Sequence, residues 1–480
     1  MLPRDAALMA DETLRAAVRP PTPGDRVHML GIGGVGMAGL ALLLKEKGWD
    51  VSGCDAYPGP LLAWLNDLGI PAVVGHDPNH LATQPTLLVR SPAVAWNEPE
   101  LQAACAAGIP VIDRGRLLPE LLKSRPTIAV AGTHGKTTTA SMIAWCLAAA
   151  GRPHSYCIGG VCPGLGSVAR VDTEGWTVVE ADESDGTLRY YAPEVAVITS
   201  MDLDHVDYFH EPSRLTDVFG AFADNAPSLI VPEHESAAFQ AHTGGVVSFG
   251  FGEDATWRAV DVVMTATGSQ FNVMVAGVHK GTVGLSVPGR HNIANALAAM
   301  AAGQQAGLTM AEMVAALAAF QLPKRRFELV ASGQGIRVIS DYAHHPVEIS
   351  ALIEQARLSN PKRIVAVFQP HRYSRTKAFL ESFTEVLSTL DEVILAPVYA
   401  ASEPFIEGGT SDTLFEACRR RGLNKTHNSI SVSHAFELLR AVWREGDLVL
   451  IIGAGDVDQI GGWAADVLGV STTTDGGNQQ

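Results

Sequence analysis

The chain has few cysteines, few aromatic residues and too few basic residues to balance its acidic ones. Its six cysteines in 480 residues form no C-x-x-C pair, which excludes a disulfide framework and favours free thiols in a reducing compartment. Lysine and arginine total 35 against 51 aspartates and glutamates, a formal net charge of −16. This deficit argues against nucleic-acid and anionic-membrane partners, which need a net basic surface. It still allows one small anionic ligand held by a local cluster of arginines.

Long apolar runs are also absent. No stretch reaches the roughly 18 apolar residues that cross a bilayer. Asp5, Asp11 and Glu12 interrupt the place where a signal peptide would have its apolar core. We therefore expect a cytoplasmic protein. With 47% apolar residues over 480 positions, the chain has material for about three packed domains.

Short β-rich runs followed by glycine loops recur along the chain, at residues 27–36, 128–135 and 448–455. The stretches after the first two are apolar and helical in character. Strands that alternate with helices predict an α/β fold with mainly parallel sheets.

Polar connectors at residues 123–126 and 322–326 divide the chain into three predicted domains. We place these domains at residues 1–124, 125–322 and 323–480. Within them, residues 1–24 are expected to form a flexible extension and residues 471–480 a disordered tail.

The first glycine loop reads Gly31-Ile-Gly33-Gly34-Val-Gly36-Met, after a predicted strand and before a predicted helix. Its glycines let the backbone approach a diphosphate, and the N–H groups at the start of the helix bind the charge. With Asp55 at the end of the next strand, the pattern is typical of NAD binding. The same loop would hold UDP equally well.

The second glycine loop, residues 132–139, reads Gly-Thr-His-Gly-Lys-Thr-Thr-Thr and also joins a strand to a helix. It resembles a phosphate-binding loop, in which backbone N–H groups surround the phosphates, Lys136 neutralises them and Thr137 can bind Mg²⁺. The strict pattern would need glycine where Val130 stands, so this loop is a variant.

Two predicted strands behind this loop end in acidic residues. The first ends in Glu180-Ala-Asp-Glu-Ser-Asp185, and the second in Asp202-Leu-Asp-His205-Val-Asp207. Oxygen ligands at the carboxyl ends of strands are typical of a Mg²⁺ site in an α/β nucleotide-binding domain. Solvated loop carboxylates would explain one such cluster, but two clusters behind a phosphate loop favour the metal site.

Basic residues gather in the last third of the chain. Lys324-Arg-Arg326 begins it, and two predicted strands are followed by Asp341-Tyr-Ala-His-His345 and by Gln369-Pro-His-Arg-Tyr-Ser-Arg375. Arginines at strand ends suit phosphates and carboxylates, because the guanidinium group donates paired hydrogen bonds. A zinc site from His344, His345 and His371 is disfavoured, because adjacent histidines usually diverge and no cysteine is near in the sequence.

Together these motifs resemble the Mur ligase family. The resemblance rests on both glycine loops, the acidic run from Glu180, the basic runs, and Gly289-Arg-His-Asn-Ile-Ala-Asn295, all in order between residues 26 and 468. The loop with Val130 is the family's own form. The resemblance implies a Rossmann-like N-terminal domain that binds a UDP-sugar, a central P-loop ATPase-type domain, and a Rossmann-like C-terminal domain that binds the amino acid and closes the site.

The resemblance also implies roles for individual residues. Those expected to contact the UDP-sugar are Gly31, Gly33, Gly34, Gly36, Asp55 and Ser91. Those expected to contact ATP are Gly132, Thr133, His134, Gly135, Lys136, Thr137, Thr138, Asn292, Asn295, Arg326 and Asp341. Mg²⁺ would be held by Thr137, Glu180 and His205, and the incoming amino acid by Tyr342, His344, Arg372 and Arg375. Catalysis would depend on Lys136, Glu180, His205 and Arg326.

The branch of the family with the most similar motifs adds L-alanine to UDP-N-acetylmuramate, with ATP and Mg²⁺, through an acyl phosphate. Relatives that add later amino acids use a carbamylated lysine where Gly220 stands here, and its absence favours the alanine branch. A monomer or weak homodimer is expected. Three alternatives remain open: a recycling ligase that attaches a tripeptide to the same sugar nucleotide, an NAD-dependent oxidoreductase, and a P-loop regulatory module without synthesis.

Overall fold

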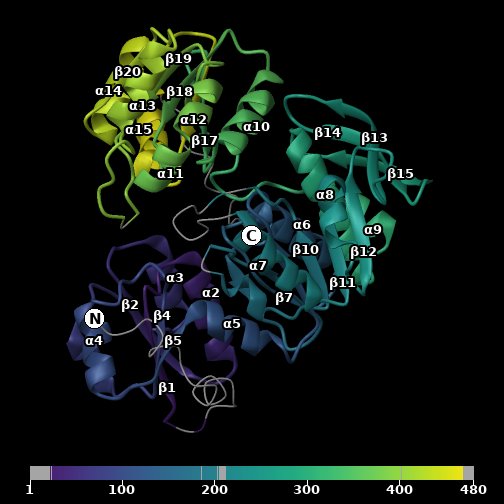
Figure 1. The fold of residues 1–480 in the computed structure, drawn as a ribbon, viewed down its shortest axis with the longest axis vertical. Coiled ribbons are helices and arrows are strands. Elements are labelled where there is room, and N and C mark those ends of the chain that lie inside the picture. The colour runs from purple at the N-terminus through teal and green to yellow at the C-terminus, as the bar shows by residue number, and fades with distance from the viewer. Residues whose placement is uncertain are drawn as a thin grey trace, which may run out of the picture.

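The computed structural model describes residues 22, 24–184, 186–202, 204, 212–401 and 403–468. Almost all of the predicted extension at 1–24, and the whole predicted tail at 471–480, lie outside the described residues. Figure 1 shows three lobes that follow one another along the chain, each built on its own sheet.

The first lobe is a five-stranded parallel sheet in the order β3-β2-β1-β4-β5. Its strands are β1 (Arg26–Leu30), β2 (Asp50–Asp55), β3 (Ala72–Val74), β4 (Leu87–Arg90) and β5 (Val111–Asp113). Its helices are α2 (Val35–Glu46), α3 (Pro60–Asp67), η1 (Pro78–Thr83), α4 (Pro99–Ala106) and α5 (Arg114–Leu122). The strand order reverses between β1 and β4, the place where an open α/β sheet binds its ligand.

The central lobe carries a ten-stranded sheet in the order β15-β14-β13-β12-β11-β10-β6-β9-β7-β8. Its strands are β6 (Thr127–Ala131), β7 (His154–Cys157), β8 (Ala169–Arg170), β9 (Trp176–Glu180), β10 (Val195–Ile198), β11 (Ser228–Pro232), β12 (Gly245–Gly250), β13 (Trp257–Met264), β14 (Ser269–Val275) and β15 (Val278–Leu285). Its helical segments are α6 (Lys136–Ala149), η2 (Thr187–Tyr190), α7 (Pro212–Asp224), η3 (Glu233–Phe239), α8 (Arg290–Gln305) and α9 (Met310–Leu317). β6 pairs in parallel with β9 and β10, so both acidic strand ends flank the phosphate loop.

The third lobe has a six-stranded sheet in the order β16-β17-β21-β18-β19-β20. Its strands are β16 (Glu328–Gly333), β17 (Ile336–Asp341), β18 (Arg363–Phe368), β19 (Glu392–Leu395), β20 (Thr426–Asn428) and β21 (Asp447–Ile452). Its helical segments are α10 (Pro346–Arg357), α11 (Tyr373–Ala378), α12 (Leu380–Leu387), α13 (Ser411–Arg420), α14 (Val432–Val442), η4 (Asp456–Asp458) and α15 (Gln459–Leu468). All of its strands run parallel except β16.

The predicted α/β class with three sheet-bearing lobes is confirmed, whereas the residue boundaries between the domains stay a prediction. One feature was not expected: β13, β14 and β15 form an antiparallel extension of the central sheet. The strands alternate buried and exposed residues there, because only one of their faces is covered. No helix among the described residues is long and apolar enough to cross a membrane.

The first two lobes share one apolar cluster. Buried residues of the first lobe, such as Leu40 and Leu117, belong to the same cluster as Phe219 and Phe222 of the central lobe. Helices α2 and α5 contact β7, β8 and η2 directly. This packing sets the first glycine loop against the central sheet.

Candidate functional site

The second glycine loop has the backbone shape of a phosphate-binding loop. Gly132 and Gly135 have φ angles of +131° and +81°, in a region that side chains disfavour. A Cβ at Gly132 would lie 2.2 Å from Thr199 Oγ1, and one at Gly135 would lie 2.5 Å from Asn295 Oδ1. Glycine is therefore required at both positions. Gly135 is the N-cap of α6, whose first residues Lys136, Thr137 and Thr138 follow directly.

Lys136 lies among carboxylates. Its Nζ donates to Gly132 O at 2.6 Å and to Glu183 Oε1 at 3.0 Å, and lies 2.9 Å from Glu183 Oε2. Burial lowers the pKa of Lys136, but Glu183, Asp182 and Glu180 outweigh burial and raise it above its ordinary value. Burial, partly offset by Lys136, raises the pKa of Glu183 to about 7. The lysine is therefore a fixed positive charge at the start of a helix, where an anion would sit.

Thr137 and Glu180 form the second polar pair of the loop. Thr137 Oγ1 donates to Glu180 Oε2 at 2.8 Å, and the N–H of Gly159 donates to the same oxygen at 2.8 Å. A hydroxyl and a carboxylate side by side offer the hard oxygen ligands that Mg²⁺ prefers. His205, the third predicted metal ligand, lies outside the described residues.

The rest of the loop contacts the segment after β10 in its own lobe and helix α10 of the third lobe. Thr133 Oγ1 donates to Asp202 O at 2.8 Å, and the N–H of His134 donates to Ser200 Oγ at 2.9 Å. His134 Nδ1 lies 3.1 Å from Glu348 Oε1, on α10 of the third lobe. Burial lowers the pKa of His134, but Glu348 outweighs it and the pKa is raised. The contact between His134 and Glu348 thus joins the loop to the C-terminal lobe.

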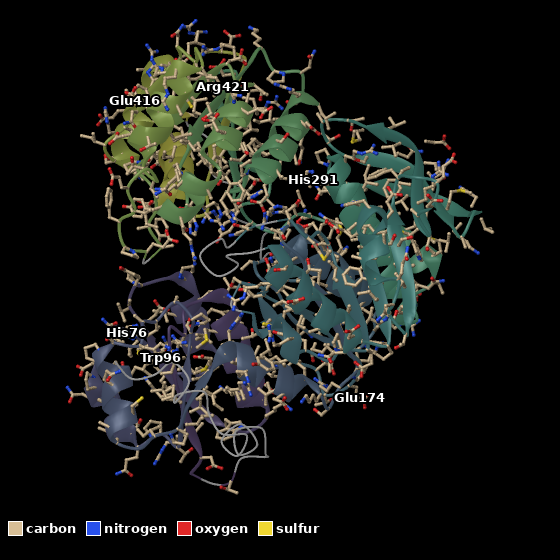
Figure 2. The ribbon with its side chains drawn as sticks, in the orientation of Figure 1. His76, Trp96, Glu174, His291, Glu416 and Arg421 are labelled. Carbon is tan, nitrogen blue, oxygen red and sulfur yellow. The ribbon has the colours of Figure 1, made fainter. Side chains whose placement is uncertain are left out.

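Asn292 and Asn295 lie on the first turns of α8, beside the phosphate loop. Both are buried, and Asn292 Nδ2 donates to Pro288 O at 2.7 Å. Next to them is a pocket of about 330 Å³ between α8 and α10, lined by Arg290, His291 and Gln355 among others. His291 faces this boundary between the central and C-terminal lobes (Figure 2).

Arg326, Asp341 and Tyr342 come together on the C-terminal side of the same boundary. Asp341 accepts the N–H groups of Phe327 at 2.7 Å and Ala343 at 2.8 Å. Burial raises the pKa of Asp341, with Arg326 opposing it. The guanidinium of Arg326 lies 5.4 Å from the centroid of the Tyr342 ring.

Arg375 makes a two-point ion pair across the lobes. Its Nε and Nη2 donate to the two carboxylate oxygens of Asp204, each at 2.9 Å. Its Nη1 also lies 3.1 Å from His371 Nδ1. Asp204 belongs to the second acidic run of the central lobe. The pair therefore places the basic segment after β18 in contact with that acidic run.

Arg372 and His344 lie close by. Arg372 is the N-cap of α11, with a φ of +71°. The rings of His344 and His371 lie 5.7 Å apart, and the N–H of His344 donates to Glu348 Oε2 at 2.9 Å. Burial lowers the pKa of His344 to about 4, so this ring is neutral at physiological pH. The four residues predicted to hold the amino acid therefore share one region.

The first glycine loop is equally well defined. Gly31 has a φ of +78°, and a Cβ there would lie 2.8 Å from the Cβ of Ser91. Asp55 Oδ2 accepts the N–H of Gly33 at 3.0 Å, so its carboxylate supports the loop. Gly34 is the N-cap of α2. A Cβ at Gly36 would lie 1.7 Å from Arg114 Nη1, which shows that Arg114 covers this end of the loop.

Three residues that the sequence analysis did not assign complete the site. Arg114 Nη2 lies 3.9 Å from Asp182 Oδ2 and so connects the first loop to the carboxylates around Lys136. Glu183 forms an ion pair with Lys136, and the carboxylate of Glu348 contacts the imidazole rings of His134 and His344. The signal for Glu348 was its place three residues after His345, because the two form a capping box at the start of α10.

Comparisons with known proteins match three consecutive segments of the chain between residues 26 and 455 to domains of one family. Residues 26–126 match the model of the Mur ligase family catalytic domain. Residues 130–303 match the Mur ligase middle domain, and residues 325–455 the Mur ligase glutamate ligase domain.

Individual relatives span nearly the full length. The chain is 42% identical to a UDP-N-acetylmuramate–L-alanine ligase of Kineococcus radiotolerans, over 91% of this chain and 94% of that protein. It is 38% identical to the enzyme of that name in Oleidesulfovibrio alaskensis, over 92% and 98%. Among solved structures, the UDP-N-acetylmuramate–alanine ligase of Thermotoga maritima superimposes with a TM-score of 0.79 at 28% identity, covering 92% of this chain and 98% of that one. A murein peptide ligase of Psychrobacter arcticus gives 0.70 at 26% identity, covering 94% and 100%. The chain belongs to the Mur ligase family.

Proposed function

We propose that this chain joins L-alanine to the lactyl carboxylate of UDP-N-acetylmuramate at the expense of ATP, in peptidoglycan precursor synthesis. The observation that carries the proposal is the position of Lys136, at the start of α6 and beside the acidic ends of β9 and β10. The identity of 42% to an alanine ligase over 91% of the chain supports the choice of substrates.

The carboxylate must first be activated, because it is anionic and has no good leaving group. A lactyl oxygen attacks the γ-phosphorus of ATP, ADP leaves, and an acyl phosphate forms. The N–H groups of the loop from Gly132 to Gly135 would hold the phosphates, and Lys136 would offset the charge that develops on the γ-phosphoryl oxygens. To do so, Lys136 has to exchange Glu183 for phosphate, a move that its flexible stem permits.

Mg²⁺ is expected at Thr137 and Glu180, whose neighbouring oxygens fit a hard divalent cation. When bound, this ion would neutralise part of the charge on the phosphate oxygens. His205 would complete the set, as the family resemblance implies.

The second step needs a neutral amine. The nitrogen of L-alanine attacks the acyl carbon, and phosphate leaves from a tetrahedral intermediate. Tyr342, His344, Arg372 and Arg375 would surround the amino acid, with a guanidinium group binding its carboxylate. Burial lowers the pKa of His344 to about 4, so the ring is neutral near pH 7 and does not repel the ammonium group of the incoming amino acid, while the leaving phosphate takes the proton that the amine loses.

Domain closure would bring these parts together. Arg326 and Asp341 of the third lobe would reach the γ-phosphate and the ribose, and Asn292 and Asn295 the adenine side. Contacts such as His134 with Glu348 would hold the closed arrangement and keep water from the acyl phosphate. Gly31, Gly33, Gly34, Gly36, Asp55 and Ser91 would bind the UDP-sugar, with Arg114 added by its place over Gly36.

The experiment is a phosphate-release assay with UDP-N-acetylmuramate, ATP and a panel of L-alanine, L-serine, glycine and the tripeptide, with the product identified by mass. We expect release that depends on both UDP-N-acetylmuramate and L-alanine, and a product heavier by one alanine residue. Activity with the tripeptide and none with alanine would instead assign the recycling reaction. Phosphate release without any ligated product would overturn the proposal in favour of a regulatory module. Light scattering on the same sample tests the proposed monomer or weak homodimer.

A further inference from the structure

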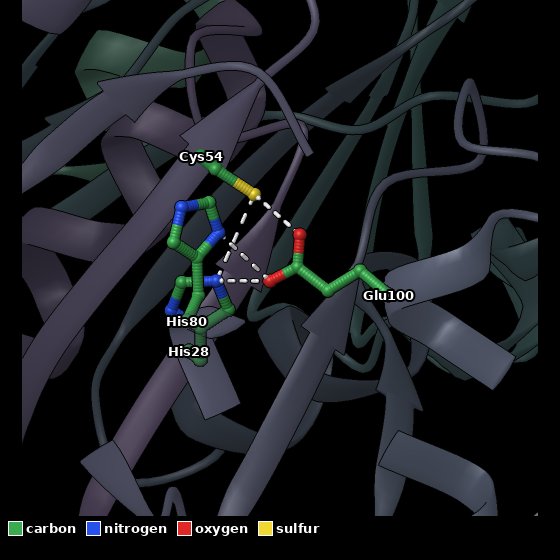
Figure 3. Close-up of side chains that lie close together, drawn as sticks. All are labelled: His28, Cys54, His80 and Glu100. Carbon is green, nitrogen blue, oxygen red and sulfur yellow. Dashed lines mark hydrogen bonds and ion pairs between the residues drawn. The ribbon is translucent and has the colours of Figure 1, made fainter. Parts of the chain in front are cut away.

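A second group of chemically reactive side chains lies in the first lobe, away from the phosphate loop. It consists of His28 on β1, Cys54 on β2, His80 on η1 and Glu100 on α4 (Figure 3). One nitrogen, sulfur or oxygen atom from each of the four lies within 4.8 Å of the others. Four separate elements thus direct donor atoms to one point.

The spacing of these atoms is close to that of a tetrahedral metal site, with three of the four distances below slightly shorter than a bound ion would set them. Zn²⁺ bonds to nitrogen and oxygen at about 2.0–2.2 Å and to sulfur at about 2.3 Å, which places neighbouring ligand atoms roughly 3.3–3.7 Å apart. His28 Nε2 lies 2.9 Å and His80 Nδ1 3.2 Å from Glu100 Oε1. Cys54 Sγ lies 3.2 Å from Glu100 Oε2 and 3.7 Å from His28 Nε2. Small side-chain shifts suffice to admit the ion.

Burial and donor type point the same way. Glu100 and Cys54 are fully buried, His28 is 3% exposed, and the side chain of His80 is 25% exposed. A buried carboxylate surrounded by imidazoles and a thiol satisfies its hydrogen bonds without a metal, so the network also has a purely structural explanation. Imidazole, thiol and carboxylate are the three side-chain types that bind zinc. The structural explanation does not account for why these three types occur together here.

We propose that His28, Cys54, His80 and Glu100 bind one Zn²⁺ ion in a closed, structural site. Binding exchanges the thiol proton of Cys54, which leaves to solvent, for a metal–sulfur bond. His76 would be an outer partner, since its Nδ1 lies 3.0 Å from Cys54 Sγ. With four protein ligands and no open position, the ion would stabilise the fold and take no part in catalysis.

The site lies directly behind the first glycine loop. The carbonyl of Cys54 accepts the N–H groups of Gly31 at 2.8 Å and Ile32 at 3.1 Å. The next residue, Asp55, accepts the N–H of Gly33. An ion that fixes Cys54 would therefore also fix the loop, so we expect zinc removal to loosen it and to lower the affinity for a uridine diphosphate.

The test is a Co²⁺ titration of tag-free, chelator-treated protein, because a cobalt–thiolate bond gives a charge-transfer band that oxygen ligands do not. We expect one equivalent of Co²⁺ to produce this band in the full chain, and Zn²⁺ to abolish it by displacement. The band is expected to be lost in Cys54→Ser and retained in Cys418→Ser, a control for another buried free thiol. His80→Gln, at the most exposed ligand, is expected to weaken Co²⁺ binding by roughly tenfold or more.

Zinc is also expected to raise the melting temperature of the wild-type chain and of Cys418→Ser, with no effect on Cys54→Ser. Absence of the band in the wild-type chain, or its persistence in Cys54→Ser, would overturn the proposal. If Cys54→Ser does not fold, an unchanged Co²⁺ affinity in His80→Gln would also overturn the proposal. No nucleotide or amino acid enters these measurements, so their outcome is independent of the ligase activity.

Discussion

Arg375 and Asp204 form a buried, two-point ion pair that joins the C-terminal lobe to the central lobe. The side chains are 3% and 4% exposed, and both oxygens of the carboxylate are bound. In this arrangement the guanidinium group expected to hold the amino acid is already occupied by an aspartate. L-alanine would have to share Arg375 with Asp204, or leave its carboxylate to Arg372.

Replacing only one member of the Arg375–Asp204 ion pair should destabilise the fold. We expect Arg375→Gln and Asp204→Asn each to lower the free energy of unfolding by about 3–5 kcal/mol, because the remaining charge is buried without its partner. The double variant should lose less than the sum of the two. A double-mutant cycle by denaturant unfolding measures this coupling, with the exposed pair Lys123 and Glu120 as a control expected at less than about 1 kcal/mol. Additive losses at Arg375 and Asp204 would contradict it.

Removing the charge of Lys136 should stop phosphoryl transfer. We expect Lys136→Met to lower kcat by about 100- to 1,000-fold, because the charge on the transferring phosphoryl group is no longer offset. Binding of UDP-N-acetylmuramate should remain, since the site proposed for it lies in the first lobe. ADP release and calorimetric binding are the measurements, with Lys123→Met as the matched control. Equal loss of activity in both variants would point to a general effect of lysine removal.

Glu180 should control the response to magnesium. Glu180→Gln keeps an acceptor for Thr137 and Gly159 but removes the negative charge, so we expect the Mg²⁺ concentration for half-maximal activity to rise. Activity measured across a magnesium series at saturating ATP shows this. Glu174→Gln, on an exposed turn, is the control and should leave the curve unchanged (Figure 2). The expectation fails if both variants give the wild-type curve.

Stability should fall in mild acid, and His344 should account for part of the loss. An unfolded histidine takes up its proton below a pKa of about 6.5. In the fold, burial lowers the pKa of His344 to about 4, so between these values the unfolded state binds more protons. The contribution of His344 to the free energy of unfolding is therefore fully present above pH 6.5 and declines as the pH falls from 6.5 to about 4.

Glu348 adds a further loss at lower pH, below its ordinary pKa of 4.5, because His344, His134 and Arg326 outweigh its burial and hold its pKa well below that value, so the unfolded state takes up this proton first. We expect His344→Gln to flatten the pH dependence by up to about 1.4 kcal/mol per pH unit, the slope of one proton. Denaturant unfolding between pH 4 and 7 measures it, with His279→Gln on exposed β15 as the control. A slope that is identical in all three proteins would contradict the role of His344.

The sequence by itself determined which parts the molecule has. Glycine spacing, strand-to-helix transitions and acidic strand ends are local patterns, so both loops, α6 and the acidic end of β9 could be read directly. The α/β class and the three sheets followed from the same alternation. The antiparallel strands β13–β15 were missed, because their pairing depends on contacts with the edge of the central sheet and not on their own pattern.

Only the tertiary structure decided which parts meet. Lys136 and Glu183 are 47 residues apart, Arg375 and Asp204 171, and His134 and Glu348 214, and no local pattern carries those pairings. The group around Glu100 is the same case, since its four donors come from two strands and two helical segments. Local propensities specify elements, whereas the packing of three sheets fixes which side chains become neighbours, and it is there that buried charges find their partners.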